Sequence, residues 1–287
     1  MSGNLSPDST SGVRDFDPII PNRIARPSLM GILNVTPDSF YSESRVTHEN
    51  VIDKAKQMIE NGADWLDIGG ESTRPGAEKI SIEQEIERVI PVIREIRERF
   101  PEVFMSIDTM NHQVARLAIE NGANMINDVS GLRDSKMIEL VIETGCDVCI
   151  MHMQGEPQNM QEEPNYEDVV EEVACYLEQK AELLIQRGHS KQSIVIDPGI
   201  GFGKTHDHNI ALMKAVRRFK SSGLSLLWGI SRKSVIGLIT NKSAASDRLS
   251  GTLGSSVFAA MNGVDILRVH DIDEHNDLFK VLQALID

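Results

Sequence analysis

The sequence predicts an α/β fold, a (β/α)8 (TIM) barrel formed as a single domain. From residue 28 onward, short apolar runs alternate with longer amphipathic helical patterns. This alternation favours parallel strands joined by helices, which build either a doubly wound sheet or a closed barrel. Eight such units in roughly 260 residues match the barrel in both count and size.

The strands are expected where the apolar runs occur, and the helices between them. The runs end near Asn34, Asp67, Asp108, Asn127, Met151, Asp197, Gly229 and Arg268. Helical periodicity separates them and is clear over residues 49–63, 81–100, 111–123, 166–188 and 206–219. Several of these stretches close on a glycine, which is common at a helix C-terminus because glycine adopts the left-handed conformation there.

One folded domain is predicted, preceded by a tail. Residues 1–27 are rich in Ser, Asp, Pro and Asn and lack periodicity, so we predict a mobile N-terminal tail. Residues 28–287 show neither a repeat nor a linker, and we assign them to the barrel. The longest connection, residues 152–165, reads as a loop on the barrel, and residues 35–48 after the first strand are a candidate lid.

Charge and hydropathy exclude several classes of protein. The chain of 287 residues carries 29 basic and 43 acidic residues, a net charge of -14, and its pI is near 5.0. This balance argues against a non-specific nucleic-acid binder or a protein that binds anionic membranes. The sequence shows no membrane-length apolar run and no signal-like core near its start, and it has only three cysteines. We therefore predict a cytoplasmic location.

Three short patterns resemble known motifs but are interpreted structurally. Cys146 and Cys149 form a C-x-x-C inside an apolar run, which favours a strand over a redox or metal pair. The segment DPGIGFGKT resembles a phosphate-binding P-loop, but Pro198 stands where its first glycine is required. His206 and His208 are two residues apart at a helix start, so they do not face one another and no zinc site is expected.

The candidate site lies where the strands end, because barrel enzymes place their active sites at the C-terminal ends of the strands. Polar residues cluster at these positions: Asp108, Asn127, Asp128, Asp197, Ser231, Arg232, Lys233, Arg268 and His270. A single Asp after a strand is more often a cap or a turn residue. Several on one rim indicate a site instead, and two carboxylates, an amide and a lysine suit a planar heterocycle with a guanidine-like edge.

A second group of residues suggests anion binding. Thr73 and Arg74 lie in the Gly/Pro loop ESTRPGAEK, and Arg268 with His270 lies on the last strand. Arginine and histidine beside free backbone N–H groups suit a phosphate or pyrophosphate, and barrels often bind phosphate near their last strands. The alternative is that these residues pair with the many surface acids.

Eight segments together give the chain a family resemblance. They are MGILNVTPDSF, DIGGESTRPGA, SIDT, INDVSG, MHMQG, IDPGIGFGK, GISRKS and RVHD, in this order at the ends of successive strands. Along nearly all of residues 29–287 the sequence resembles dihydropteroate synthase, a pterin-binding family of folate biosynthesis. The resemblance implies a (β/α)8 barrel, usually a homodimer, that is a transferase of the alkyl/aryl class. It would join 4-aminobenzoate to (7,8-dihydropterin-6-yl)methyl diphosphate, release pyrophosphate, use Mg2+ and be a target of sulfonamides.

The resemblance also implies roles for individual residues. The pterin would be held by Asp108, Asn127, Asp197 and Lys233, inside a pocket walled by Met151, Phe202 and Gly229. The diphosphate would be held by Asn34, Arg268 and His270, with Mg2+ near Asn34, while Asp38, Thr73 and Arg74 close over the leaving group. The 4-aminobenzoate would lie at Ser234 and Lys233, with Pro75 and Phe40 as apolar neighbours. The catalytic set implied is Asp108, Lys233, Arg268, Asp38 and Arg74.

The implied mechanism is a dissociative substitution at the pterin methylene carbon. As the C–O bond breaks, the pterin ring gains positive charge, which the Asp108 carboxylate stabilises. Mg2+ and Arg268 neutralise the departing pyrophosphate, and the arylamine then attacks. No protein nucleophile is required, in agreement with the lack of a convincing Ser-His-Asp or Cys-His arrangement in the sequence.

One segment departs from the family pattern, and two other functions remain as alternatives. After TPDSF the family commonly has a Ser-Asp-Gly-Gly turn, whereas this chain reads YSESR, so the loop is expected to be stiffer or to close differently. A pterin-dependent methyltransferase would pass a methyl group to a corrinoid protein and would need neither a diphosphate clamp nor the SRKS segment, so STRPGA and RVHD weigh against it. A non-catalytic pterin-binding relative would be expected to have lost the SRK lysine or the RVH pair.

Overall fold

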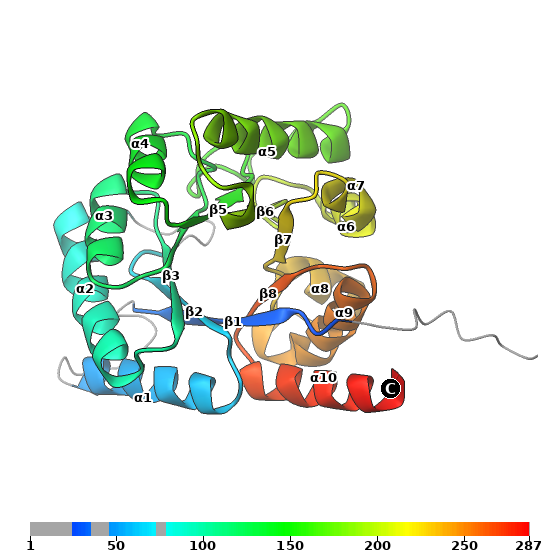
Figure 1. Ribbon diagram of the computed structural model, residues 1–287. Helices are drawn as coiled ribbons and strands as arrows, with labels where there is room; N and C mark the ends of the chain where they lie inside the picture. Colours follow the sequence, from blue (N-terminus) through cyan, green and yellow to red (C-terminus); the bar gives the residue numbers. More distant parts are fainter. Residues whose placement is uncertain (1–24, 36–45, 73–78, 287) are drawn as a thin grey trace, which may run out of the picture.

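Eight parallel strands form a closed barrel in the computed structural model, which describes residues 25–35, 46–72 and 79–286 (Figure 1). The strands are β1 (Ser28–Asn34), β2 (Trp65–Gly69), β3 (Phe104–Asp108), β4 (Met125–Asp128), β5 (Asp147–Met151), β6 (Ile194–Asp197), β7 (Ser225–Trp228) and β8 (Ile266–Val269). Each strand pairs with its neighbours in sequence, and β8 pairs with β1 to close the ring. The predicted fold class is confirmed.

The helices lie around the outside of the barrel, as Figure 1 shows. They are α1 (Val46–Glu60), α2 (Ile82–Arg99), α3 (His112–Glu120), α4 (Ser135–Thr144), α5 (Val169–Gln186), α6 (His206–Lys214), α7 (Val216–Lys220), α8 (Ser234–Thr240), α9 (Leu249–Met261) and α10 (Ile272–Ile286). Two short 3-10 helices also occur: η2 (Lys191–Ser193) lies between α5 and β6, and η3 (Ala245–Arg248) lies between α8 and α9. The helix predicted over residues 206–219 is interrupted at Ala215, whose ψ of 22° leaves the helical region, and forms α6 and α7.

Local sequence explains where helix α2 begins and which face it buries. Ser81 Oγ accepts a hydrogen bond from Gln84 N at 3.2 Å, and the Gln84 side chain accepts one from Ser81 N at 3.0 Å. This capping box satisfies two backbone N–H groups that have no partner inside the helix. Val89, Ile93 and Ile96 recur at helical spacing and are fully buried against the barrel.

Side-chain alternation along the strands builds the interior of the barrel. The buried interior cluster consists of Met30, Met125, Cys149, Val195, Leu227 and Ile266, with Trp65 packed against it. Because a strand repeats every two residues, the residue two positions further along each strand faces the same interior, one layer nearer the C-terminal rim. Six of these positions are Asp67, Asn127, Met151, Asp197, Gly229 and Arg268. The fold therefore places polar groups directly above an apolar plug.

The predicted boundaries hold to within a few residues. Asn34, Asp108, Met151 and Asp197 end their strands as predicted, while β2 continues past Asp67 to Gly69. Residues 152–165 contain neither helix nor strand, as expected for a loop.

The start of the predicted barrel domain can be compared with the described chain. Of the predicted tail, residues 1–24 lie outside the described residues. Arg26, however, donates to Asp64 Oδ2 at 2.7 Å and to Gly62 O at 2.9 Å. The chain therefore contacts the barrel slightly before the predicted start at residue 28. Over the described ranges, the helices are too short or too polar to cross a membrane.

Candidate active site

An arginine held between two carboxylates lies at the centre of the rim. Arg268 Nε donates to Asp67 Oδ2 at 2.5 Å, and Arg268 Nη2 donates to Asp108 Oδ2 at 2.6 Å. Asn127 Nδ2 donates to the same Asp67 oxygen at 3.2 Å. The second carboxylate oxygens, Asp67 Oδ1 and Asp108 Oδ1, are buried and have no hydrogen-bond partner in the described chain. Buried carboxylate oxygens need donors, so this rim is suited to a ligand that supplies N–H groups.

Burial sets the ionisation of Asp108. The pKa of Asp108 is raised to about 7, chiefly because the carboxyl group is removed from water and also because the carboxylate of Asp67 lies nearby. Arg268 opposes both effects because its positive charge favours the ionised carboxylate. The Asp108 carboxyl group therefore changes charge near neutral pH.

A second pair, Asp197 and Lys233, faces the same interior from β6 and from the loop after β7. Gly199 N donates to Asp197 Oδ1 at 2.7 Å, which fixes the carboxylate. A Cβ atom placed on Gly229 would lie 3.8 Å from Asp197 Oδ2 and 3.9 Å from Lys233 Nζ. Gly229 therefore keeps open the space between the two groups, which a larger side chain would fill.

The Lys233 ammonium group is held by the loop that follows β6. Its Nζ atom donates to the Ile200 carbonyl oxygen and lies 4.4 Å from the centre of the Phe202 ring, a cation–π geometry. Burial lowers the pKa of Lys233 to about 8, and Asp197 opposes that shift. Burial in turn raises the pKa of Asp197, and the lysine opposes this shift too. Phe202 also packs against the buried apolar cluster that contains Met151.

The chain folds so that Asn34 and Asp108 lie close together. A Cβ atom placed on Gly69 would lie 3.8 Å from Asn34 Oδ1 and 3.7 Å from Asp108 Oδ2. Gly69 is the last residue of β2, between the ends of β1 and β3. The Asn34 side chain makes no hydrogen bond within the described residues, so its amide oxygen is available to a ligand.

Two contacts join the loop after β7 to the loop after β8. Ser231 Oγ lies 2.9 Å from His270 Nδ1. Next to this contact, Arg232 Nε donates to Asp271 Oδ2 at 2.8 Å and Arg232 Nη2 donates to Asp271 Oδ1 at 2.5 Å. Arg232 has a φ of 57°, in the left-handed region that non-glycine residues adopt rarely. The bidentate ion pair holds this strained residue in place.

Ser234 is the first residue of α8 and is exposed. It lies next to Lys233, which occupies the cap position of that helix. Five of the predicted site residues, namely Asp38, Phe40, Thr73, Arg74 and Pro75, lie outside the described residues. The structure thus brings together the predicted residues on the strand ends and does not describe those on the two long loops.

Two buried residues of the site received no role in the sequence analysis. Asp67 is fully buried and binds both Arg268 and Asn127. Asp67 is the central residue of the strand sequence WLDIG. An acidic residue in the middle of an apolar strand is unusual, and this signal could have identified it as a site residue.

Lys204, the second of these residues, is 3% exposed. Its Nζ atom donates to Phe202 O at 2.9 Å and to His152 O at 3.2 Å, and lies 3.1 Å from His152 Nδ1. Burial lowers the pKa of Lys204 to about 7. Because Lys204 follows a glycine-rich loop, its sequence context alone gave no sign of burial.

Other polar features of the molecule have structural roles. Asp128 accepts hydrogen bonds from Ser130 and Leu132 and thereby shapes the turn after β4. His208 forms the capping box of α6 with Thr205. The described residues include no group of three or more His, Cys, Asp or Glu side chains arranged to hold a metal ion. Cys146 and Cys149 are free thiols.

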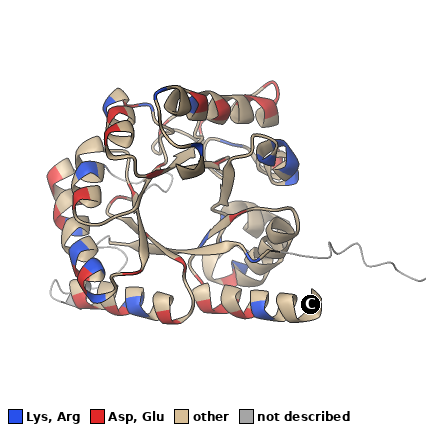
Figure 2. Cartoon of the chain, in the orientation of Figure 1, with Lys and Arg blue, Asp and Glu red and all other residues tan. Residues whose placement is uncertain are grey.

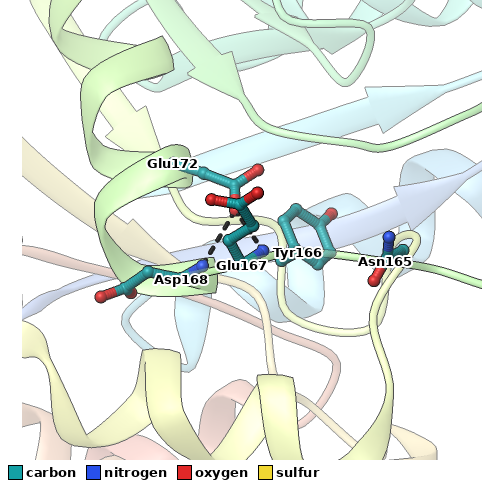
Figure 3. A pocket seen from close by; sticks show the side chains of 5 residues that line it. All are labelled: Asn165, Tyr166, Glu167, Asp168 and Glu172. Atoms are coloured by element: carbon teal, nitrogen blue, oxygen red, sulfur yellow. Dashed lines mark hydrogen bonds between the residues drawn. The ribbon is translucent and has the colours of Figure 1, made fainter.

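A surface pocket of about 360 Å³ lies beside the start of α5 (Figure 3). Its lining residues are Asn165, Tyr166, Glu167, Asp168 and Glu172. Figure 3 shows that Glu172 points back to the backbone N–H groups of Glu167 and Asp168, which donate to it at 2.7 Å and 3.0 Å. Asp168 caps the helix. The acidic side chains of this pocket therefore satisfy the start of α5, and we assign no ligand to it.

Comparison with known proteins shows which family the chain resembles in sequence. The sequence profile of the family described as pterin binding enzyme matches residues 30–270. Dihydropteroate synthase of Escherichia coli (strain K12) is 46% identical over 266 residues, which cover 92% of this chain and 93% of that protein.

Two solved structures extend the comparison to the fold. Xanthomonas albilineans dihydropteroate synthase with 4-aminobenzoic acid has a TM-score of 0.85 and 39% identity, covering 91% of this chain and 94% of that one. The same enzyme in complex with 7,8-dihydropteroate has a TM-score of 0.82 and 36% identity, covering 92% of this chain and 95% of that one.

Proposed function

The chain belongs to the dihydropteroate synthase family of pterin-binding enzymes, and on this premise we propose how its rim performs the reaction. The chain condenses (7,8-dihydropterin-6-yl)methyl diphosphate with 4-aminobenzoate to give 7,8-dihydropteroate and pyrophosphate, a transferase step of folate biosynthesis. The observation that carries the residue assignment is the presence of two oppositely charged pairs on one rim: Asp108 in an ion pair with Arg268, and Asp197 in electrostatic interaction with Lys233.

The pterin is proposed to bind between these two pairs. Asp197 would accept hydrogen bonds from the amino group and ring N–H of the pterin, because a carboxylate matches that two-donor edge. Asp108 and Asn127 would bind the other polar atoms of the ring. The free Asp108 Oδ1 supports this assignment, since a buried acceptor without a donor is otherwise costly. Met151, Phe202 and Gly229 would wall the pocket, and Lys233 would lie at its edge.

The diphosphate is proposed to bind at Asn34, Arg268 and His270. Two nitrogens of the Arg268 guanidinium bind carboxylates, and Nη1 makes no hydrogen bond to the described residues. Arg268 can therefore reach a phosphate oxygen through Nη1 while Asp67 still holds Nε. Thr73, Arg74 and Asp38, outside the described residues, are proposed to close over this group.

Mg2+ fits this rim as an ion shared with the substrate. Mg2+ prefers oxygen ligands and is usually held by one or two protein groups together with water and phosphate oxygens. Asn34 offers one amide oxygen beside Asp108, and no carboxylate cluster among the described residues competes for the ion. When bound, Mg2+ would neutralise charge on the departing pyrophosphate.

In the proposed substitution, each protein group stabilises a different charge or holds a different reactant. Asp108 stabilises the positive charge that grows on the pterin ring as the C–O bond breaks. Arg268 stabilises the negative charge on the leaving pyrophosphate. The 4-aminobenzoate, held by Ser234 and Lys233 beside Pro75 and Phe40, attacks the methylene carbon through its amine. No covalent intermediate with the protein is required.

The reaction itself is tested by pyrophosphate release from purified protein. We expect release from the pterin diphosphate with Mg2+ only when 4-aminobenzoate is present, together with formation of 7,8-dihydropteroate. A sulfonamide is expected to compete with 4-aminobenzoate in this assay, because it has the same arylamine and a similar anionic end. Pterin binding without arylamine-dependent release would instead indicate a non-catalytic relative.

We also propose that the chain forms a homodimer through α8, α9 and α10. Neither α8 nor α9 contains a charged residue, and Figure 2 shows them largely without charge, unlike the helices around α2. Six large apolar side chains are exposed on the three helices: Leu238, Ile239, Phe258, Met261, Val281 and Leu285. Exposed apolar side chains gathered on neighbouring helices are typical of an association surface.

Leu238→Glu is expected to weaken the dimer by about tenfold or more, because a charge would be buried in an apolar interface. Leu238 is 62% exposed in the single chain, so the substitution should leave the monomer folded. Light scattering after gel filtration measures the mass, and Leu183→Glu on α5 is the matched control. A dimer that survives Leu238→Glu but dissociates with Leu183→Glu would place the interface elsewhere.

A cytoplasmic location remains our proposal. The three cysteines are all free, which is usual in a reducing compartment. Cell fractionation with a tagged chain would test it.

A further inference from the structure

The contact between Ser231 and His270 bears on which nitrogen of the imidazole ring carries the proton, as well as on the position of the ring. Ser231 lies in the loop after β7 and is 6% exposed, so its hydroxyl depends on protein partners. Its Oγ atom accepts a hydrogen bond from His270 N at 3.2 Å and lies 2.9 Å from His270 Nδ1. The Arg232–Asp271 ion pair on the next residue of each loop holds the two loops in register.

Counting hydrogens selects one tautomer of His270. A serine hydroxyl carries one hydrogen and can also accept. If the Ser231 hydroxyl donates to Nδ1 while it accepts from His270 N, the hydroxyl hydrogen and the backbone N–H of His270 both have partners. If Nδ1 carried the proton instead, Ser231 Oγ would accept two hydrogen bonds and its own hydrogen would have no acceptor among the described residues. The first arrangement is favoured because an unpaired buried donor is costly.

The surroundings of His270 also favour the neutral ring. Burial lowers the pKa of His270 to about 4, and the positive charges of Arg268, Lys54 and Arg232 lower it too. Asp271 is the charged group that acts in the opposite direction. His270 is therefore neutral at physiological pH, although a histidine at an anion site is usually expected to be a cation.

The geometry points to Ser231 as a positioning residue that fixes His270 as a neutral imidazole with its proton on Nε2. Nε2 makes no hydrogen bond to the described part of the chain, so this N–H is free to donate to a diphosphate oxygen. His270 directly follows the last residue of β8, two positions after Arg268, so both residues lie at the same end of that strand. This inference rests on the proposed function in one respect, namely that the diphosphate is the acceptor.

The tautomer is tested directly by long-range 1H–15N correlation spectra of the full chain labelled at its histidines. His270 is assigned by its loss in His270→Gln. Between pH 6 and 8 we expect a protonated Nε2 and an unprotonated Nδ1, and in Ser231→Ala we expect the other tautomer to be populated. A proton on Nδ1 in the unaltered protein, an imidazolium ion at pH 7, or an unchanged tautomer in Ser231→Ala would each overturn the inference.

The effect on binding is measured with pyrophosphate and Mg2+ by calorimetry. We expect Ser231→Ala to weaken pyrophosphate binding by about 3- to 10-fold, the usual loss when one neutral hydrogen bond is misdirected. Ser231→Thr, which returns a hydroxyl, should restore both the tautomer and most of the affinity. Ser256→Ala is the matched control, because Ser256 also contacts a histidine, His275, at 3.1 Å, but between α9 and α10.

The outcomes separate this inference from the proposed function. Equal losses of pyrophosphate affinity in Ser231→Ala and Ser256→Ala, in parallel with lower melting temperatures, would show a merely structural role and overturn it. A changed tautomer with unchanged affinity would overturn the link between Ser231 and the diphosphate. If the unaltered protein has the expected tautomer but binds no pyrophosphate, the diphosphate assignment fails while the tautomer assignment stands.

Discussion

Asp197→Asn is expected to weaken pterin binding on the order of 100-fold or more. The amide keeps the size of the side chain but replaces one acceptor oxygen with a donor, which would face the N–H edge of the pterin. Loss of charge-assisted hydrogen bonds costs about 1.5 to 3 kcal/mol each, and Lys233 would lose its opposite charge as well. Calorimetry with a dihydropterin ligand measures the affinity.

The matched control for Asp197→Asn is Asp265→Asn at the opposite end of the barrel. Asp265 also binds a lysine, accepting from Lys220 Nζ at 2.5 Å, and accepts from Leu226 N at 2.6 Å. Asp265→Asn is expected to lower thermal stability and to leave pterin affinity unchanged. Near-native pterin affinity in Asp197→Asn would remove Asp197 from the proposed pocket.

Asp108→Asn is expected to lower kcat on the order of 10²- to 10³-fold, the usual cost of removing a group that stabilises transition-state charge. The effect depends on pH. Because burial raises the pKa of Asp108 to about 7, the carboxylate is mostly protonated at pH 6 and mostly ionised at pH 8. The rate of the unaltered enzyme should therefore rise with pH across this interval, and in Asp108→Asn this rise should disappear.

Asn127→Asp serves as the comparison for Asp108→Asn, because it adds a carboxylate beside the same Asp67 oxygen. The extra negative charge should raise the pKa of Asp108 further and move the rise in rate to higher pH. A rise that persists unchanged in Asp108→Asn would assign it to another group. An unchanged kcat in Asp108→Asn would contradict the proposed role of Asp108.

Much of the fold could be predicted because strand and helix patterns are local. The residue two positions beyond each interior apolar residue is polar or small on several strands, as Asn127 follows Met125 and Asp197 follows Val195. This repeat predicts both the strand and the face on which the polar group lies. The split of the helix at Ala215 could not be predicted, because alanine favours helix and no local signal in the sequence marks a break there.

The sequence predicted many of the residues that form the site, but it did not predict the contacts between them. Residue types at strand ends indicated Asp108, Asn127, Asp197, Lys233 and Arg268. The eight segments that contain them indicated the family to which the chain belongs. The sequence did not reveal that Arg268 binds Asp67, because these residues are 201 positions apart and meet only when the barrel closes. It also did not show that Lys204 is buried, since a lysine after a glycine-rich loop is normally exposed.

The sequence by itself therefore determined the order of the elements, the fold class and the chemical types on the rim. The tertiary structure alone decided which of these groups touch and how each is charged. Closure of the ring sets distances between strands remote in sequence, and removal from water shifts the pKa values of Asp108, Lys204 and His270 toward their neutral forms. Both depend on what surrounds a side chain in space, which no local pattern of residues records.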